Sequence, residues 1–121
     1  MYRRGDKEFV LDMFLACQKI LRYTEGMAYE EFINDERTKD AVMRNIEILG
    51  EAVKNLSKEF MEKYPNVKWS KIARARDKLI HFYFGIDEGA LWDMVRESVP
   101  ALFETLKSII TTEGWQDELE E

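Results

Sequence analysis

Hydrophobic residues recur at three- and four-residue spacings along most of the chain, which is the pattern of amphipathic α-helices. The first predicted helix runs from about Asp6 to Thr24, with Gly26 beyond its C-terminus. Its apolar arc is wide enough to contact two neighbouring elements. We therefore expect this helix to lie inside a bundle.

A second long helix is predicted over 36–56, because Asn34 and Asp35 have the character of an N-cap. Its hydrophobic positions repeat with a period of about 3.5 residues, which favours nearly antiparallel packing at shallow angles. These positions are Val42, Ile46, Leu49, Val53 and Leu56. Ser57 then caps a predicted short helix over 58–64.

The third long helix is predicted to begin after Ser70 as its N-cap and to end near Gly85. Its apolar stripe consists of Ile72, Leu79, Ile80 and Tyr83. Arg76 falls in the middle of this stripe, so its guanidinium must find partners. Glu47 and Glu51 of the preceding helix are candidates, although both also fit ordinary surface carboxylates.

The last helix is predicted to follow an N-cap at Asp87, with Pro100 kinking it on the side away from the apolar face. We assign residues 1–112 to one helical domain and 113–121 to an acidic tail that frays. The expected fold is all-α, an up-and-down bundle of four to five helices.

The composition fits this single helical domain. The chain has 121 residues, of which 45% are hydrophobic, and only two prolines and six glycines. It has no run of about eighteen apolar residues and no signal peptide, so we expect a cytoplasmic protein without a membrane span. Cys17 is expected to be a core hydrophobe. One cysteine and one histidine form no disulfide or zinc framework, so we expect no metal and no cofactor.

The net charge of −6 argues against a general nucleic-acid coat protein, but positive charge is concentrated around His81, the only histidine. The basic residues are Lys68, Lys71, Arg74, Arg76 and Lys78, and Asp77 is the lone acid among them. Two interpretations stay open: a solvated basic face that balances acidic neighbours, or a local site for a polyanion.

The central residues fit RNA chemistry without a metal. A histidine can remove the proton of a ribose 2′-hydroxyl or protonate the leaving oxygen, while an arginine fork holds the phosphate. His81 and Arg76 supply these groups, and Asp77, one turn before His81, can orient the imidazole or bind the sugar. Because Arg76 and His81 point in different directions on one helix, we expect a two-fold homodimer to bring them together.

The segment Arg76–Tyr83 resembles the Arg-x4-His-x-Tyr signature of HEPN domains, including the polar residue after the arginine. The blocks 38–52 and 83–87, with Trp69 and Trp92, are similar to the HepT-like toxin subfamily. The resemblance covers roughly residues 7–110, which is most of the chain.

This resemblance implies an all-helical homodimer in which two such motifs face a shared cleft and act as a metal-independent ribonuclease. It also implies a toxin of a two-gene system, with RNA as substrate and a small MntA-like minimal nucleotidyltransferase as antitoxin. In that pairing AMP is transferred to the motif tyrosine, here Tyr83, beside catalytic Arg76, Asp77 and His81. Lys71, Arg74 and Lys78 are the expected substrate-binding residues.

Two other functions fit the sequence. The chain could be a non-catalytic subunit that docks a nucleotidyltransferase and presents nucleotide or substrate to it. It could also be a simple helical dimer without chemistry, in which case Arg76→Ala alters stability alone.

Overall fold

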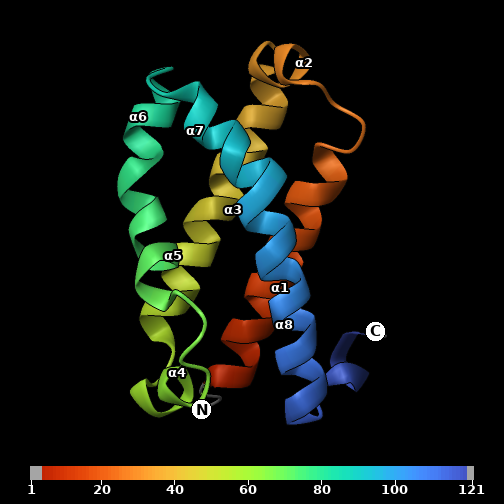
Figure 1. Ribbon diagram of the computed structural model, residues 1–121, viewed down its shortest axis with the longest axis vertical. Helices are drawn as coiled ribbons and strands as arrows, with labels where there is room; N and C mark the ends of the chain where they lie inside the picture. The colour runs from red at the N-terminus through yellow and green to blue at the C-terminus, as the bar shows by residue number, and fades with distance from the viewer. Residues whose placement is uncertain (1–3, 120–121) are drawn as a thin grey trace.

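The computed structural model of the protein describes residues 4–119. The chain runs up, down, up and down through four long helical stretches, as predicted for an up-and-down bundle (Figure 1). In chain order, its helical segments are α1 (Asp6–Tyr23), α2 (Tyr29–Ile33), α3 (Glu36–Asn55), α4 (Lys58–Lys63), α5 (Trp69–Ala75), η1 (Arg76–Lys78), α6 (Leu79–Tyr83), α7 (Glu88–Asp93), η2 (Met94–Ser98), α8 (Val99–Glu113) and η3 (Gln116–Leu119).

The long helices α1 and α3 begin and end close to their predicted positions. The Asp35 carboxylate accepts a hydrogen bond from the backbone N–H of Thr38, and this bond lowers the Asp35 pKa because it favours the charged form. Ser57 caps α4 in the same way through the N–H of Phe60. Helix α1 packs against both α3 and α8, which explains its wide apolar arc.

The third predicted helix differs from expectation. It begins at Trp69 with Lys68 as the N-cap residue, so the prediction of Ser70 as N-cap was wrong. A 3₁₀ turn, η1, also interrupts it at Arg76–Lys78. Because a 3₁₀ turn winds more tightly than an α-helix, positions after η1 are rotated relative to the regular pattern.

This rotation changes which side chains are buried. Ile80 and Tyr83, which we placed in the apolar stripe, are 61% and 71% exposed, whereas Phe82 is buried. Ile72 and Leu79 are half-buried, as partial members of the core. The predicted stripe is therefore correct at Ile72 and Leu79 and wrong at Ile80 and Tyr83.

Pro100 is accommodated by a change of helical winding. Asp87 caps α7 as predicted, by accepting a hydrogen bond from the N–H of Ala90. The segment η2 is a π-helical turn, and α8 begins directly after it, with Pro100 in its first turn. The helical backbone is continuous through Ser98 and Val99, and the π-helical turn accommodates the ring and the missing N–H of the proline that follows it.

Over the described residues 113–119 the tail packs against the bundle, which differs from the expected fraying. Trp115 stacks on Phe60 of α4 with ring centroids 5.9 Å apart, and Glu118 forms an ion pair with Lys7. The boundary between a domain 1–112 and a tail 113–121 stays a prediction. None of the helices described is long and apolar enough to span a bilayer.

Candidate functional site

The segments α5, η1 and α6 together form the third helical stretch of the bundle. Arg76 lies where this stretch contacts α3. Its Nη1 donates a hydrogen bond to Oε2 of Glu51 at 2.7 Å, and its side chain is only 29% exposed. The sequence-based expectation that this guanidinium needs a partner is confirmed. Glu51 is that partner, and its own side chain is a surface carboxylate that is 59% exposed.

Gly50 makes room for the stem of Arg76. A Cβ atom at position 50 would lie 2.7 Å from Cδ of Arg76, closer still to its Cγ, and 3.3 Å from the carbonyl oxygen of Ala73. Any larger residue at this position would collide with the arginine. Sequence reasoning missed this role, although a glycine inside a long helix is a signal of close approach.

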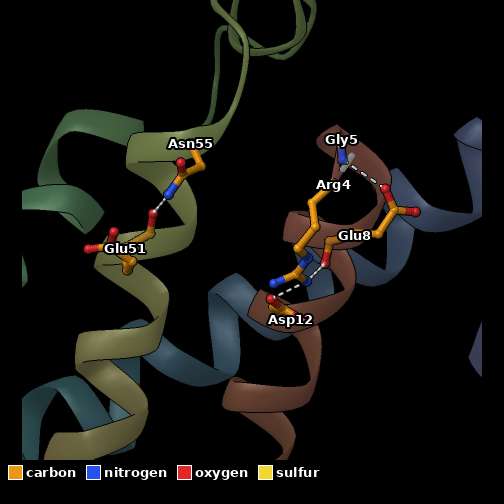
Figure 2. A network of polar contacts seen from close by, with 6 residues as sticks. All are labelled: Arg4, Gly5, Glu8, Asp12, Glu51 and Asn55. Carbon is orange, nitrogen blue, oxygen red and sulfur yellow. Dashed lines mark hydrogen bonds and ion pairs between the residues drawn. The ribbon is translucent and has the colours of Figure 1, made fainter. Parts of the chain in front are cut away.

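The Arg76 side chain lines a charged cavity of about 350 Å³ between α1 and α3. Three ion pairs border this cavity: Arg76 with Glu51, Arg44 with Glu47 at 2.6 Å, and Arg4 with Asp12 at 2.6 Å. Figure 2 shows Arg4, just before α1, paired with Asp12 of α1, and Glu51 across from them on α3. Each arginine is thus neutralised by a carboxylate.

The other basic residues that we predicted line a second, larger cavity. A groove of about 850 Å³ lies between the third helical stretch and α8, with Ile46 and Leu49 of α3 at its floor. Lys71, Arg74, Asp77 and Lys78 border it. The structure therefore brings Lys71, Arg74 and Lys78 together, but places them on a different cavity from that of Arg76.

His81 lies on α6, and its side chain is exposed. Within residues 4–119, its imidazole has no hydrogen-bond or ion-pair partner, so no such bond joins it to Asp77. The expected orientation of His81 by Asp77 is thus absent from the single chain. His81 also lines neither of the two cavities.

Large apolar side chains surround His81 at the surface. Ile80, Tyr83, Phe84 and Ile86 are between 56% and 71% exposed, and the rings of Tyr83 and Phe84 meet edge to face at 5.5 Å. Exposed apolar residues gathered in this way mark an interaction surface. The Tyr83 ring, which we predicted as a modification site, is accessible.

Two further groups bear on the chemistry. Cys17 is buried in the core as predicted, and this burial raises the pKa of its thiol to about 12, so the reactive thiolate does not form near neutral pH. Over residues 4–119, no three or more histidine, cysteine, aspartate or glutamate side chains are grouped so that they could hold a metal ion.

Comparisons with known proteins agree on one family. The profile of the family described as "Ribonuclease HepT-like" matches residues 13–109. A protein of Methanocaldococcus jannaschii named as a candidate RNase is 41% identical over 118 residues, which cover 98% of each chain. The "Probable ribonuclease HepT" of Thermococcus cleftensis is 41% identical over 108 residues, covering 87% of this chain and 98% of the relative.

No solved structure matches the chain. The family profile, however, spans most of the sequence, including the whole segment from Gly50 to Tyr83 that forms the site. The chain belongs to the HepT-like ribonuclease family.

Proposed function

We propose that this protein is a toxin of a toxin–antitoxin system that cleaves RNA without a metal ion. The observation that carries the proposal is the state of the motif residues: Arg76 is held half-buried with most of its N–H donors unused, and His81 is exposed. Family membership supports the same reaction class.

In the proposed reaction the ribose 2′-oxygen attacks the adjacent phosphorus, and the bond from phosphorus to the leaving 5′-oxygen breaks. His81 removes the 2′-hydroxyl proton or gives a proton to the leaving oxygen. Arg76 holds the phosphate oxygens as negative charge builds on them. Lys71, Arg74 and Lys78 attract the RNA backbone toward the groove, while Asp77 binds the sugar or orients the imidazole.

The proposed active form is a homodimer. Within one chain, five helical steps of roughly 100° to 120° separate Arg76 from His81, which gives a net rotation of roughly 140° to 200°. The two groups therefore point to different sides. The apolar patch formed by Ile80, Tyr83, Phe84 and Ile86 offers the surface through which a second copy can complete the site.

The proposed antitoxin is a minimal nucleotidyltransferase that modifies Tyr83. The Tyr83 hydroxyl oxygen attacks the α-phosphorus of ATP, releases pyrophosphate and loses its proton, which leaves AMP on the ring. The 71% exposure of Tyr83 makes this attack possible without unfolding. The added phosphate is an anion that competes with RNA phosphate for the site arginine.

The test is cleavage of cellular RNA by the purified protein in the presence of a chelator. We expect His81→Ala and Arg76→Ala each to lower the rate by at least about a hundredfold, in line with the loss of an acid–base group. Arg44→Ala is the matched control, because Arg44 lines the same cavity as Arg76 but is 69% exposed. Activity that disappears in chelator contradicts the metal-free mechanism, and activity unchanged by His81→Ala contradicts the role of His81. A wild-type protein that cleaves no RNA would favour the non-catalytic binding subunit.

A further inference from the structure

Glu51 forms an ion pair with Arg76 but has no part in the reaction described above. We propose that Glu51 is a positioning residue, which holds the guanidinium of Arg76 in the orientation that receives the RNA phosphate. This inference rests on the proposed ribonuclease function.

The contact between the two residues joins separate helices. Glu51 is on α3 and Arg76 is 25 residues later in η1, and the bond of 2.7 Å between them crosses the interface. The Arg76 side chain is 29% exposed and the Glu51 side chain 59% exposed, so water screens this pair only somewhat less than one in which both side chains are fully exposed. The pair therefore fixes the orientation of Arg76 relative to α3.

The stem and the end of the arginine are held by different means. Because Gly50 has no Cβ atom, a notch at this position accepts the Cγ and Cδ atoms of Arg76, which fixes the direction of the stem. The terminal guanidinium can still rotate about the last bonds of the side chain. The hydrogen bond to Glu51 limits this rotation, because one defined nitrogen, Nη1, donates to one defined oxygen.

The same hydrogen bond leaves capacity for a substrate. A guanidinium has five N–H donors, and among the described residues Arg76 uses only one of them, toward Glu51. The others can donate to phosphate oxygens while Glu51 stays bound. Glu51 thus orients the Arg76 guanidinium and leaves its other N–H donors available to a phosphate.

The neighbouring pair of Arg44 and Glu47 provides a contrast. Glu47 lies one turn before Glu51 on the same helix and borders the same cavity. Its partner Arg44 is only three residues away on α3 and is 69% exposed. Because both residues of this surface pair lie on α3, the pair does not hold a side chain from another helix. Glu47 is therefore a matched control for Glu51.

The experiment measures kcat and KM for RNA cleavage. We expect Glu51→Ala to lower kcat about tenfold or more, since displacement of a catalytic group by about 1 Å can cost up to about a hundredfold. KM should stay constant or fall, because a carboxylate that repels phosphate is removed. Glu51→Gln keeps an acceptor oxygen and should restore kcat to within about threefold of wild type.

Two further variants keep the test independent of folding. Glu51→Lys repels Arg76 and should lower kcat at least as far as Glu51→Ala, whereas Glu47→Gln should match wild type. NMR of the arginine side chains should show a slowly rotating Arg76 guanidinium in wild type and in Glu47→Gln, and a freely rotating one in Glu51→Ala.

The outcomes separate this inference from the proposed function. If wild type cleaves RNA and Glu51→Ala has the same or a higher kcat, or an unchanged Arg76 signal, the assignment of Glu51 is wrong while the ribonuclease stands. If wild type does not cleave RNA, the proposed function is wrong, and the assignment of Glu51 fails with it.

Discussion

The side chain of Arg76 occupies the space in which a side chain at position 50 would lie. Gly50 is in the interior of α3, and a Cβ atom there would come within 2.7 Å of the arginine Cδ. A glycine in a helix interior costs about 1 kcal/mol relative to alanine. This cost is explained by the close approach of an arginine from the third helical stretch, which only glycine allows.

Gly50→Ala is therefore expected to lower RNA cleavage at least about tenfold, because the new methyl group pushes Arg76 out of its notch. The usual gain in helix stability, up to about 1 kcal/mol, should be absent. Cleavage assays and thermal unfolding measure both effects. The control is Gly89→Ala on α7, where nothing lies within 4 Å of an added Cβ; a Gly50 variant as active as this control would contradict the assigned role.

Lys71→Ala and Lys78→Ala are expected to weaken binding of all RNA sequences to a similar extent, because the proposed role of these lysines is to attract the phosphate backbone and not to bind the bases. The slope of log affinity against log salt should fall in magnitude by about one for each lysine removed. Binding titrations at several salt concentrations measure this. Lys19→Ala on α1, at an exposed position bordering neither cavity, serves as control and should leave the slope unchanged.

Ile80→Asp is expected to convert the proposed dimer into a monomer at micromolar concentration, since it places a charge in the exposed apolar patch. Analytical ultracentrifugation measures the change. Leu15 on α1 is 45% exposed, so Leu15→Asp tests whether any exposed apolar position has this effect. Wild-type protein that sediments as a monomer would contradict the dimer itself.

Glu113→Gln is expected to lower the melting temperature at neutral pH but not in acid. Hydrogen bonds from Lys63, at 2.7 Å, and from Tyr64 lower the Glu113 pKa from its ordinary value of 4.5. A carboxyl with a lowered pKa in the folded chain stabilises the fold above its unfolded pKa, and this effect is lost as the pH falls through the folded value.

The difference in melting temperature between Glu113→Gln and wild type should therefore be full at neutral pH and shrink below about pH 4.5. Glu104→Gln is the control on the same helix, because Glu104 is 70% exposed and lies 3.7 Å from Lys107. A difference that stays constant with pH would show that Glu113 does not act through its charge.

The regular parts of the fold follow from local sequence. Asp35, Ser57 and Asp87 each cap a helix through a backbone N–H three residues on, and this pattern is visible in the sequence itself. The hydrophobic period of α3 likewise predicts its antiparallel packing. Helix positions and the up-and-down arrangement were therefore predictable.

The site was only partly predictable, since its geometry depends on contacts between helices. The sequence indicates that Arg76 needs a partner, but the choice of Glu51 over Glu47 depends on how α3 packs against the third helical stretch. The 3₁₀ turn η1 has no proline or glycine to signal it. The exposure of Ile80 and Tyr83 after this turn was consequently missed.

The winding of η1 also bears on which subunit of the proposed dimer supplies each residue of an active centre. If Arg76 and His81 lie on different sides of one segment, each complete centre of the proposed homodimer would take its arginine from one chain and its histidine from the other. Arg76→Ala and His81→Ala, each inactive alone, should then complement one another on mixing and recover about a quarter of wild-type cleavage, because half of the randomly paired dimers regain one of two centres. A mixture that remains inactive would mean that a single chain supplies both Arg76 and His81 to the same centre.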